Sequence, residues 1–200
     1  MNDARARIRR ELRARRRAIP AAERIAAAQS LAQHLLDLPF APTSGHVAGY
    51  WAMDGEIALH AWQLQLPPSL IYCLPVLCSD ERLRFAPWRP GDALATNRYG
   101  IPEPEVPPSS LLEPEAMSLV VTPLVGFDTG GGRLGMGGGW YDRSFAFRKT
   151  QAPPPWLVGV AFSTQRCEGG IPTQPWDVAL DAVCSDRDMF ITGSIPTGDP

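Results

Sequence analysis

The sequence has few of the residues that mark export, metal binding or membrane insertion. Its four cysteines include no C-x-x-C pair, and its three histidines are scattered without metal-ligand spacing. No apolar run approaches the ~18 residues that a membrane-spanning helix needs, and the N-terminus lacks the apolar core of a signal peptide. We therefore expect reduced thiols, no membrane partner and a cytoplasmic location.

Lysine is nearly absent as well, since Lys149 is the only one, and arginine carries the basic charge. Residues 1–24 hold nine arginines against three carboxylates, a local charge of +6, and the net charge of −2 leaves −8 for the remainder. Such a segment suits a solvated basic face or a nonspecific contact with nucleic acid.

Two helices are expected at the N-terminus. The segment 4–19 has no glycine or proline, is rich in good helix formers, and sets Ile8 and Leu12 four residues apart on an apolar seam. Pro20 suits the first turn of a second helix, which Pro39 ends. The side chains expected to face inward from this second helix are Ile25, Leu31, Leu35 and Leu36.

Apolar segments that alternate with helical ones predict a mostly parallel sheet covered on both faces. The expected fold class is therefore α/β, with a three-layer α/β/α arrangement after the N-terminal helical pair. We expect a single domain over residues 1–200 with an ordered core of about 3–190. The expected strands are 45–53, 70–77, 82–88, 117–128, 156–162 and 181–186; the expected helices among them are 57–66 and 141–150; the Pro-rich segment 89–110 is expected to be an ordered loop.

A glycine-rich tract follows one of the expected buried strands. In "DTGGGRLGMGGGWYDRS" (128–144), seven of the ten residues from Gly130 to Gly139 are glycine. A loop without side chains at the carboxyl end of a strand exposes successive backbone N–H groups to an anion. Arg133 adds a guanidinium fork for phosphate oxygens, and the helix expected next adds positive charge at its N-terminus. Asp142, just inside that helix, is placed to hold a divalent cation that bridges phosphates. The tract therefore predicts a nucleotide polyphosphate site.

Other interpretations of the tract are weaker. "GGGRLG" (130–135) fits G-x-G-x-x-G, but a dinucleotide fold also needs an acidic residue about 20 positions on, and "VAFSTQ" offers none. A Walker A loop needs glycine before its lysine, and Lys149 has none; the nucleophile elbow G-x-S-x-G is absent. A mobile surface hairpin remains open, although it poorly explains Trp140 and Tyr141 beside the glycines.

Five segments in order resemble one known family. "GFDTGGGRLGMGGGWYDRSF" resembles the signature G-F-D-x-x-G-x-R-L-G-x-G-x-G-[YW]-Y-D of the 5-formyltetrahydrofolate cyclo-ligases, also called methenyltetrahydrofolate synthetases. The Arg-rich helix with "AIPAAER", the segment "MDGEI", the loop "NRYGIPEP" and the closing "TQPWDVALDAVCSD" are similar to the family's segments as well. The likeness spans residues 5 to 186, nearly the whole chain.

The resemblance implies an enzyme that converts 5-formyltetrahydrofolate and ATP into 5,10-methenyltetrahydrofolate, ADP and phosphate. ATP would be a co-substrate and Mg²⁺ the cofactor. The formyl oxygen would be phosphorylated, and N10 of the folate would then close the ring. The implied partners are small molecules, with no nucleic acid and no membrane, and the protein would be a monomer.

The resemblance also implies site residues at the matching positions. The catalytic residues would be Arg133, Tyr141 and Asp142, and the metal ligands would be Asp142 and Asp177. ATP would contact Arg5, Arg9, Arg133, Leu134, Gly135, Met136, Gly137, Gly138, Gly139, Trp140 and Tyr141. Folate would contact Trp51, Glu56, Tyr99, Met136, Gly137, Gly138, Gly139 and Trp140.

Three positions depart from the family pattern. Arg5 stands where lysine is common, and Met136 and Gly138 stand where some relatives carry basic residues. These departures motivate an alternative, a folate- or nucleotide-binding regulator that has kept the scaffold and lost turnover. The remaining arginines of the first helix, Arg13 and 15–17, suit a solvated face or nucleic acid better than they suit ATP.

Several singled-out residues also allow structural roles. Trp51 fits a plain core position, Asp177 fits a turn or cap, and Asp128 is expected to cap or orient the glycine loop. The tryptophans expected to serve in packing are Trp62, Trp88, Trp156 and Trp176.

Overall fold

Two helices open the chain, as the sequence predicts. The computed structural model describes residues 2–193 and places α1 at Asn2–Arg17 and α2 at Ala21–Leu36. Pro20 is the residue just before α2, with extended backbone angles, and does not lie inside its first turn.

The inward face of α2 is only partly as expected. Leu31 and Leu35 are buried together with Ala27, whereas Ile25 is 65% exposed. Ile25 precedes Ala27 by two residues, which is about 200° around an α-helix, so its side chain points away from the sheet. The expectation for Ile25 is therefore wrong.

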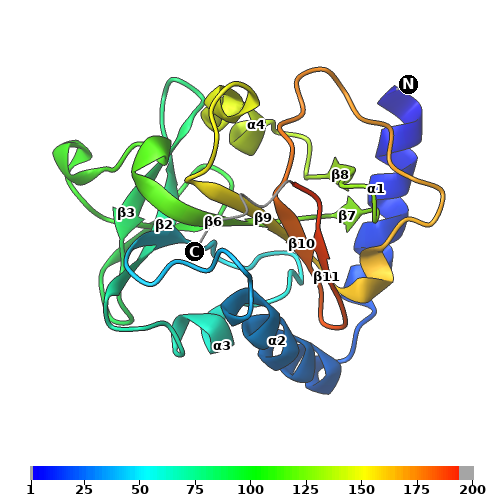
Figure 1. Cartoon of the computed structure of the whole chain (residues 1–200), viewed down its shortest axis with the longest axis horizontal. Helices are drawn as coiled ribbons and strands as arrows, with labels where there is room; N and C mark the ends of the chain where they lie inside the picture. The colour runs from blue at the N-terminus through cyan, green and yellow to red at the C-terminus, as the bar shows by residue number, and fades with distance from the viewer. Residues whose placement is uncertain (1, 194–200) are drawn as a thin grey trace, which may run out of the picture.

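A seven-stranded sheet forms the centre of the molecule, in the order β11-β10-β9-β6-β1-β2-β3 (Figure 1). Its five inner strands are parallel, and the edge strands β3 and β11 run antiparallel to their neighbours. This confirms a mostly parallel sheet in an α/β fold. The strands are β1 (Gly45–Ala48), β2 (Leu70–Leu77), β3 (Leu83–Pro87), β6 (Met117–Pro123), β9 (Trp156–Val160), β10 (Ala182–Cys184) and β11 (Met189–Ile191).

Helices cover both faces of this sheet. In Figure 1, α2 and α3 (His60–Gln63) lie on one side, and α4 (Trp140–Ser144) lies on the other. Leu119 and Val121 of β6 join the apolar cluster under α2, whereas Val120 between them joins the cluster with Phe145 behind α4. Alternate side chains of one strand thus enter two cores, which explains why the strand is apolar along its whole length.

Several expected elements are shorter or broken. The expected strand 117–128 divides, because after Pro123 the chain leaves the sheet and forms β7 (Gly126–Phe127), which pairs with β8 (Arg133–Leu134). The expected helix 141–150 is α4 followed by the 3-10 helix η3 (Ala146–Lys149).

No helix within residues 2–193 is long and apolar enough to cross a bilayer.

The remaining elements are short. The segment expected as an ordered loop contains a hairpin of β4 (Leu94–Thr96) and β5 (Pro102–Pro104). Three further 3-10 helices are η1 (Pro108–Ser110), η2 (Pro114–Ala116) and η4 (Ser163–Gln165).

Candidate active site

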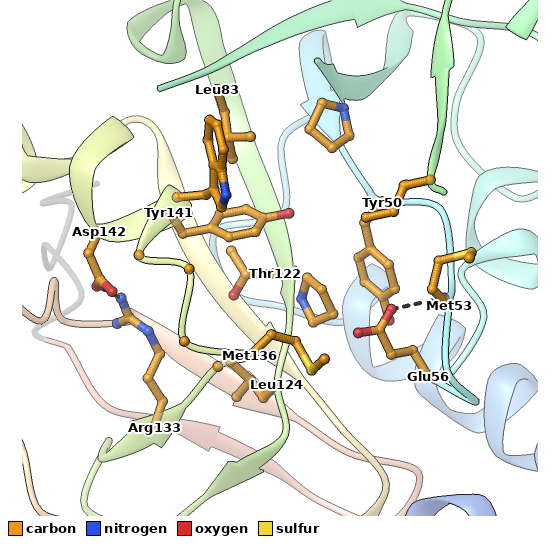
Figure 2. A pocket seen from close by; sticks show the side chains of 18 of the residues that line it. Tyr50, Met53, Glu56, Leu83, Thr122, Leu124, Arg133, Met136, Tyr141 and Asp142 are labelled. Atoms are coloured by element: carbon orange, nitrogen blue, oxygen red, sulfur yellow. Dashed lines mark hydrogen bonds and ion pairs between the residues drawn. The ribbon is translucent and has the colours of Figure 1, made fainter. Parts of the chain in front are cut away.

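A cavity of about 760 Å³ lies at the carboxyl ends of β1, β2 and β6 (Figure 2). It is lined by residues that follow or end these strands, Trp51, Leu77 and Thr122 among them. Further walls come from α1, the β4–β5 hairpin and the glycine tract. The carboxyl edge of a parallel sheet is where ligands bind in open α/β folds, and the volume suits a small-molecule site.

The first half of the glycine tract is wrapped around Asp128. One carboxylate oxygen of Asp128 accepts the N–H groups of Gly130 and Gly132 at 2.9 and 2.8 Å, and the other accepts the N–H of Ile171 at 2.7 Å. Gly132 has no room for a side chain, because a Cβ there would lie 2.3 Å from the carboxylate. Asp128 therefore orients the loop, as expected. The N–H groups of Gly130 and Gly132 donate to its carboxylate, so they are not available to bind a phosphate, although the sequence had suggested that role.

The second half of the tract faces the cavity. Gly135, Gly137 and Gly139 line it, and Gly137 has a φ of +101°, a backbone conformation that favours glycine. Arg9 lies against this half, since its Nε donates to the carbonyl of Gly135 at 2.8 Å. A Cβ on Gly137 would stand 3.5 Å from the guanidinium carbon of Arg9. Here the absence of side chains leaves space between a cation and the main chain.

Two expectations about the tract need correction. The side chain of Leu134 is fully buried and does not line the cavity, because β8 turns it toward the core. The following helix α4 has five residues, so its few aligned peptide dipoles supply less charge than the expected helix 141–150.

Three arginines make one end of the cavity cationic. Arg5, Arg9 and Arg133 all line it. Burial lowers the pKa of Arg133, while Asp142 and Asp177 oppose that shift; burial and the charge of Arg5 lower the pKa of Arg9. Nε of Arg5 is buried without a hydrogen-bond partner among residues 2–193. Partly desolvated cations with an unused donor favour a polyanionic ligand.

The two predicted metal ligands meet at this cationic end. Asp142 forms an ion pair with Arg133 and accepts the N–H of Val178 at 3.0 Å. Asp177 lies 3.3 Å from Arg5 and also accepts the N–H of Gln174 at 2.8 Å, which is the turn role that the sequence allowed. Residues 2–193 contain no group of three side chains that could hold a metal. Two carboxylates fit Mg²⁺ nevertheless, because it keeps several waters and takes further oxygens from phosphates.

The opposite end of the cavity is more apolar and contains Glu56 (Figure 2). One oxygen of Glu56 accepts the N–H of Met53 at 3.0 Å, and the other lies 3.7 Å from Arg16. Burial raises the pKa of Glu56, and the backbone hydrogen bond and Arg16 oppose the shift. Trp51 lines the same end, so it is a cavity wall and not plain core.

Two tyrosines border this apolar end. Tyr50 is buried, and its hydroxyl donates to the carbonyl of Ile57 at 2.5 Å. Figure 2 shows the hydroxyl of Tyr141 pointing into the cavity, between Glu56 and the pair of Arg133 and Asp142. Burial, followed by the charge of Glu56, raises the pKa of Tyr141. Tyr141 is therefore a hydrogen-bond donor at neutral pH.

Tyr99 is the residue of the "NRYGIPEP" segment that was expected to contact folate, but other residues of this segment line the cavity. Tyr99 is 57% exposed and does not line the cavity; its ring stands 6.4 Å from that of Trp140, at the rim. Asn97 and Glu103 do line it, and Glu103 accepts hydrogen bonds from Asn97 at 2.8 Å and from the N–H of Leu77 at 2.9 Å. These two polar residues flank the aromatic one in sequence, and the hairpin turns them inward.

Trp176 is a second residue that sequence reasoning placed wrongly. It was expected to pack in the core, yet it is 63% exposed and lines the cavity beside Asp177. The one signal in the sequence that could have predicted a place for Trp176 at the site is the neighbouring Asp177, which was predicted to bind the metal.

The C-terminal half of α1 is a solvated basic face only in part. Arg13, Arg16 and Arg17 all form ion pairs with Asp54, and Arg16 is fully buried. These ion pairs fix α1 to the turn at Asp54. The expectation of a solvated face is therefore wrong for Arg16, whereas the exposed side chains of Arg15 and Arg17 agree with it; Arg15 pairs with Glu11 on the same helix.

These features define an α/β enzyme in which a cationic glycine loop faces an apolar chamber across one cavity. A sequence model of the 5-formyltetrahydrofolate cyclo-ligase family matches residues 1–186. The chain belongs to the 5-formyltetrahydrofolate cyclo-ligase family.

Individual relatives agree with this assignment. The 5-formyltetrahydrofolate cyclo-ligase of Haemophilus influenzae is 36% identical over 177 residues, which cover 86% of this chain and 92% of the relative. The Escherichia coli K12 enzyme of the same name is 34% identical over 183 residues, 90% of this chain and 98% of the relative.

Two solved structures share the fold. The NMR structure of the Aquifex aeolicus 5,10-methenyltetrahydrofolate synthetase superposes with a TM-score of 0.79 at 25% identity, covering 98% of this chain and 96% of that one. A Mycoplasma pneumoniae 5,10-methenyltetrahydrofolate synthetase superposes with a TM-score of 0.68 at 23% identity, covering 91% and 98%. The second likeness bears on the fold alone.

Proposed function

We propose that the protein is an ATP-dependent 5-formyltetrahydrofolate cyclo-ligase, which forms 5,10-methenyltetrahydrofolate, ADP and phosphate. Family membership supports cyclo-ligase activity and the use of folate and ATP. The observation that carries the proposal is the arrangement of one cavity, with Arg133 and the glycine loop at one end and Glu56 at the other. A triphosphate and a folate bound at these ends would meet in the middle.

The chemistry explains why both ends are needed. A formamide carbon is a poor electrophile, and its oxygen is a poor leaving group. Transfer of the γ-phosphoryl group to the formyl oxygen breaks the bond to ADP and makes that oxygen part of a phosphate. N10 then attacks the activated carbon and loses its proton, and phosphate departs with the electron pair of the C–O bond. The protein must align the reactants, balance charge and exclude water.

The cationic end would bind the triphosphate. Arg5, Arg9 and Arg133 would neutralise phosphate oxygens, and the amides of 135–139 would approach them closely because no side chains intervene. Arg133 is proposed as catalytic, since its guanidinium can follow charge on the transferring group. The lysine-to-arginine departure at Arg5 keeps this charge.

Asp142 and Asp177 would hold Mg²⁺, which when bound would offset the negative charge of the phosphates. The two side chains come from α4 and from the loop before β10, and each already neutralises one arginine of the site. Binding of the metal and nucleotide would therefore exchange partners among charges already gathered at this end.

The apolar end would bind the folate. The carboxylate of Glu56 can accept two hydrogen bonds at once from the N–H edge of a pterin ring, and Trp51 offers a flat wall beside it. The hydroxyl of Tyr141 points into the space between the two ends, so it can donate to the oxygen that is phosphorylated. The residues at both proposed ends belong to the same chain, and we propose that the protein acts as a monomer.

The decisive experiment is an assay with Mg·ATP and 5-formyltetrahydrofolate. We expect ADP to form only when both substrates are present, together with the absorbance of the methenyl product. Arg133→Ala should abolish both signals, whereas Arg187→Ala, at a surface position with a 76% exposed side chain, should retain them.

The assay also separates the alternatives. Calorimetric binding of both ligands with no ADP release would favour a regulator without turnover. Absence of both binding and turnover would refute the proposed function.

A further inference from the structure

Arg16 is the most unusual charged residue of the molecule. Its side chain is 0% exposed, which is rare for arginine. It extends from α1 to the turn after β1, where its Nε donates to the carbonyl of Asp54 at 3.1 Å and its Nη2 donates to that residue's carboxylate at 2.7 Å. Its Nη1 has no hydrogen-bond partner within residues 2–193. An unpaired buried donor costs free energy, so its position calls for a physical reason.

Fixing the turn at Asp54 does not by itself account for Arg16. Arg13 donates to the Asp54 carboxylate at 2.8 Å and Arg17 donates to it at 2.6 Å, both from the same helix. Burial would raise the pKa of Asp54, but the hydrogen bonds from Arg13, Arg17 and Arg16 outweigh it and lower the pKa to about 2. Arg13 and Arg17, whose side chains are more exposed than that of Arg16, therefore already bind the Asp54 carboxylate without it.

What distinguishes Arg16 from its neighbours is the direction of Nη1. This nitrogen lies 3.7 Å from a carboxylate oxygen of Glu56, while Arg13 and Arg17 form no ion pair with that residue. The carboxylate of Glu56 is itself only 10% exposed, so solvent screens the pair weakly.

The other groups around Glu56 do not supply a comparable charge. The N–H of Met53 donates one hydrogen bond, Arg13 acts at longer range, and Asp54 repels. Burial raises the pKa of Glu56, and among the cations the charge of Arg16 opposes this shift most strongly. The neutral groups that face it from other elements are the hydroxyls of Tyr50 after β1 and Tyr141 on α4.

We propose that Arg16 is a positioning residue of the folate end: its Nη1 keeps the carboxylate of Glu56 ionised and aimed into the cavity. This inference rests on the proposed function, in which Glu56 accepts hydrogen bonds from the pterin ring. A protonated Glu56 would lose one acceptor, so the folate would bind less tightly. The phosphate end would be unaffected, because it uses Arg5 and Arg9 from the other half of α1.

The test compares Arg16→Gln with Arg17→Gln, which removes an arginine from the same Asp54 but not from Glu56. In Arg16→Gln, the KM for 5-formyltetrahydrofolate should rise severalfold at pH 6.5, because loss of the cation raises the pKa of Glu56 further and leaves less of its carboxylate ionised. The rise should shrink as the pH is raised to 8.5, because Glu56 then ionises without help. The KM for ATP should stay within about twofold of the parent value.

Arg17→Gln and the parent enzyme should show little pH dependence of the same KM. A wild-type KM for folate in Arg16→Gln, or a rise that is equal at both pH values, would overturn the inference. Arg16→Met, whose unbranched side chain can follow the aliphatic part of the arginine, is the second variant and should show the same pH-dependent rise. Failure of both variants to fold would also overturn it, by assigning Arg16 to the fold.

These outcomes are separate from the proposed function. If the parent enzyme forms no methenyl product from Mg·ATP and 5-formyltetrahydrofolate, the proposed function fails. If the parent is active and Arg16→Gln behaves like it at both pH values, only the role of Arg16 fails.

Discussion

The two halves of the glycine tract contain the same residue type and do different things. Gly130 and Gly132 donate their amides to the carboxylate of Asp128, whereas residues 135–139 line the cavity against Arg9. In the first half glycine lets the chain turn tightly around a side chain, and in the second it leaves space for a ligand. A glycine-rich segment therefore indicates only that the backbone is free to adopt unusual conformations. Whether a ligand can bind there depends on whether the N–H groups already donate to other protein atoms.

Helix α1 divides in the same way. Arg5 and Arg9 in its N-terminal half line the cavity, while Arg13, Arg16 and Arg17 in its C-terminal half are held by Asp54. The C-terminal half fixes the helix to the turn before Glu56, and so positions the N-terminal half over the cationic end of the cavity. One basic stretch thus contributes both an anchor and part of the cavity wall.

The largest effect is expected at the carboxylate that follows the second half of the tract. Asp142→Asn should lower kcat by on the order of 10²–10³, because it removes a charge that, in the proposed function, would hold the metal beside the phosphates. The amide can still accept the N–H of Val178, so the melting temperature should change little. Steady-state kinetics and a thermal melt of the same sample check this. A loss of activity explained by unfolding would make Asp142 a structural residue.

Gly137→Val should have the next largest effect. A β-branched side chain resists a φ of +101° and would crowd Arg9, so the KM for ATP should rise by about tenfold or more. The matched control in the first half is Gly130→Ala, where φ is not positive and the added Cβ would meet the Asp128 carboxylate at 3.4 Å. ATP titrations should separate the two variants; equal KM values would remove the distinction between the halves.

Asp128→Ala tests the first half directly. It leaves three amides without their acceptor, which should lower the free energy of unfolding by about 2–3 kcal/mol. Urea denaturation measures this change. The KM for ATP should rise less than in Gly137→Val, because the cavity-lining amides keep their own positions. A normal stability with abolished ATP binding would show that Asp128 belongs to the ligand site.

The smallest effect concerns the anchor of α1 and depends on pH. The folded-state pKa of Asp54, about 2, lies below its ordinary value of 3.8, so the stabilisation is complete above about pH 4 and is lost as the pH falls toward 2. The free energy of unfolding of Asp54→Asn should be lower than that of the parent at pH 6, and the gap should close between pH 4 and 2. Urea titrations at several pH values check this, and a gap that stays constant would contradict it.

Local features were predictable because they depend on neighbouring residues. Helix α1 and strand β2 occur where composition and apolar runs placed them, β2 with its bounds unchanged at Leu70–Leu77. The parallel sheet followed from the alternation of strands and helices, and the ordered motifs indicated the family. The residues expected at the site gather in one cavity, apart from Leu134 and Tyr99.

Features that depend on distant partners were not predictable. The strand expected over 117–128 breaks after Pro123 because Val125 bonds to Leu134 of the returning hairpin, not to the main sheet. Glu103 enters the cavity because the β4–β5 hairpin folds against β2, and Trp176 is exposed because its loop follows the cavity wall.

Composition, spacing and ordered motifs were enough to predict the helices, the parallel sheet and the family, because these features depend on residues close together in the chain. Which glycines line the cavity and which arginines are buried depends on contacts between distant segments. Arg9 meets Gly135 across 126 residues, and Arg16 meets Asp54 across 38. The same residue type acquires a different role according to which distant carboxylate or carbonyl the fold brings beside it.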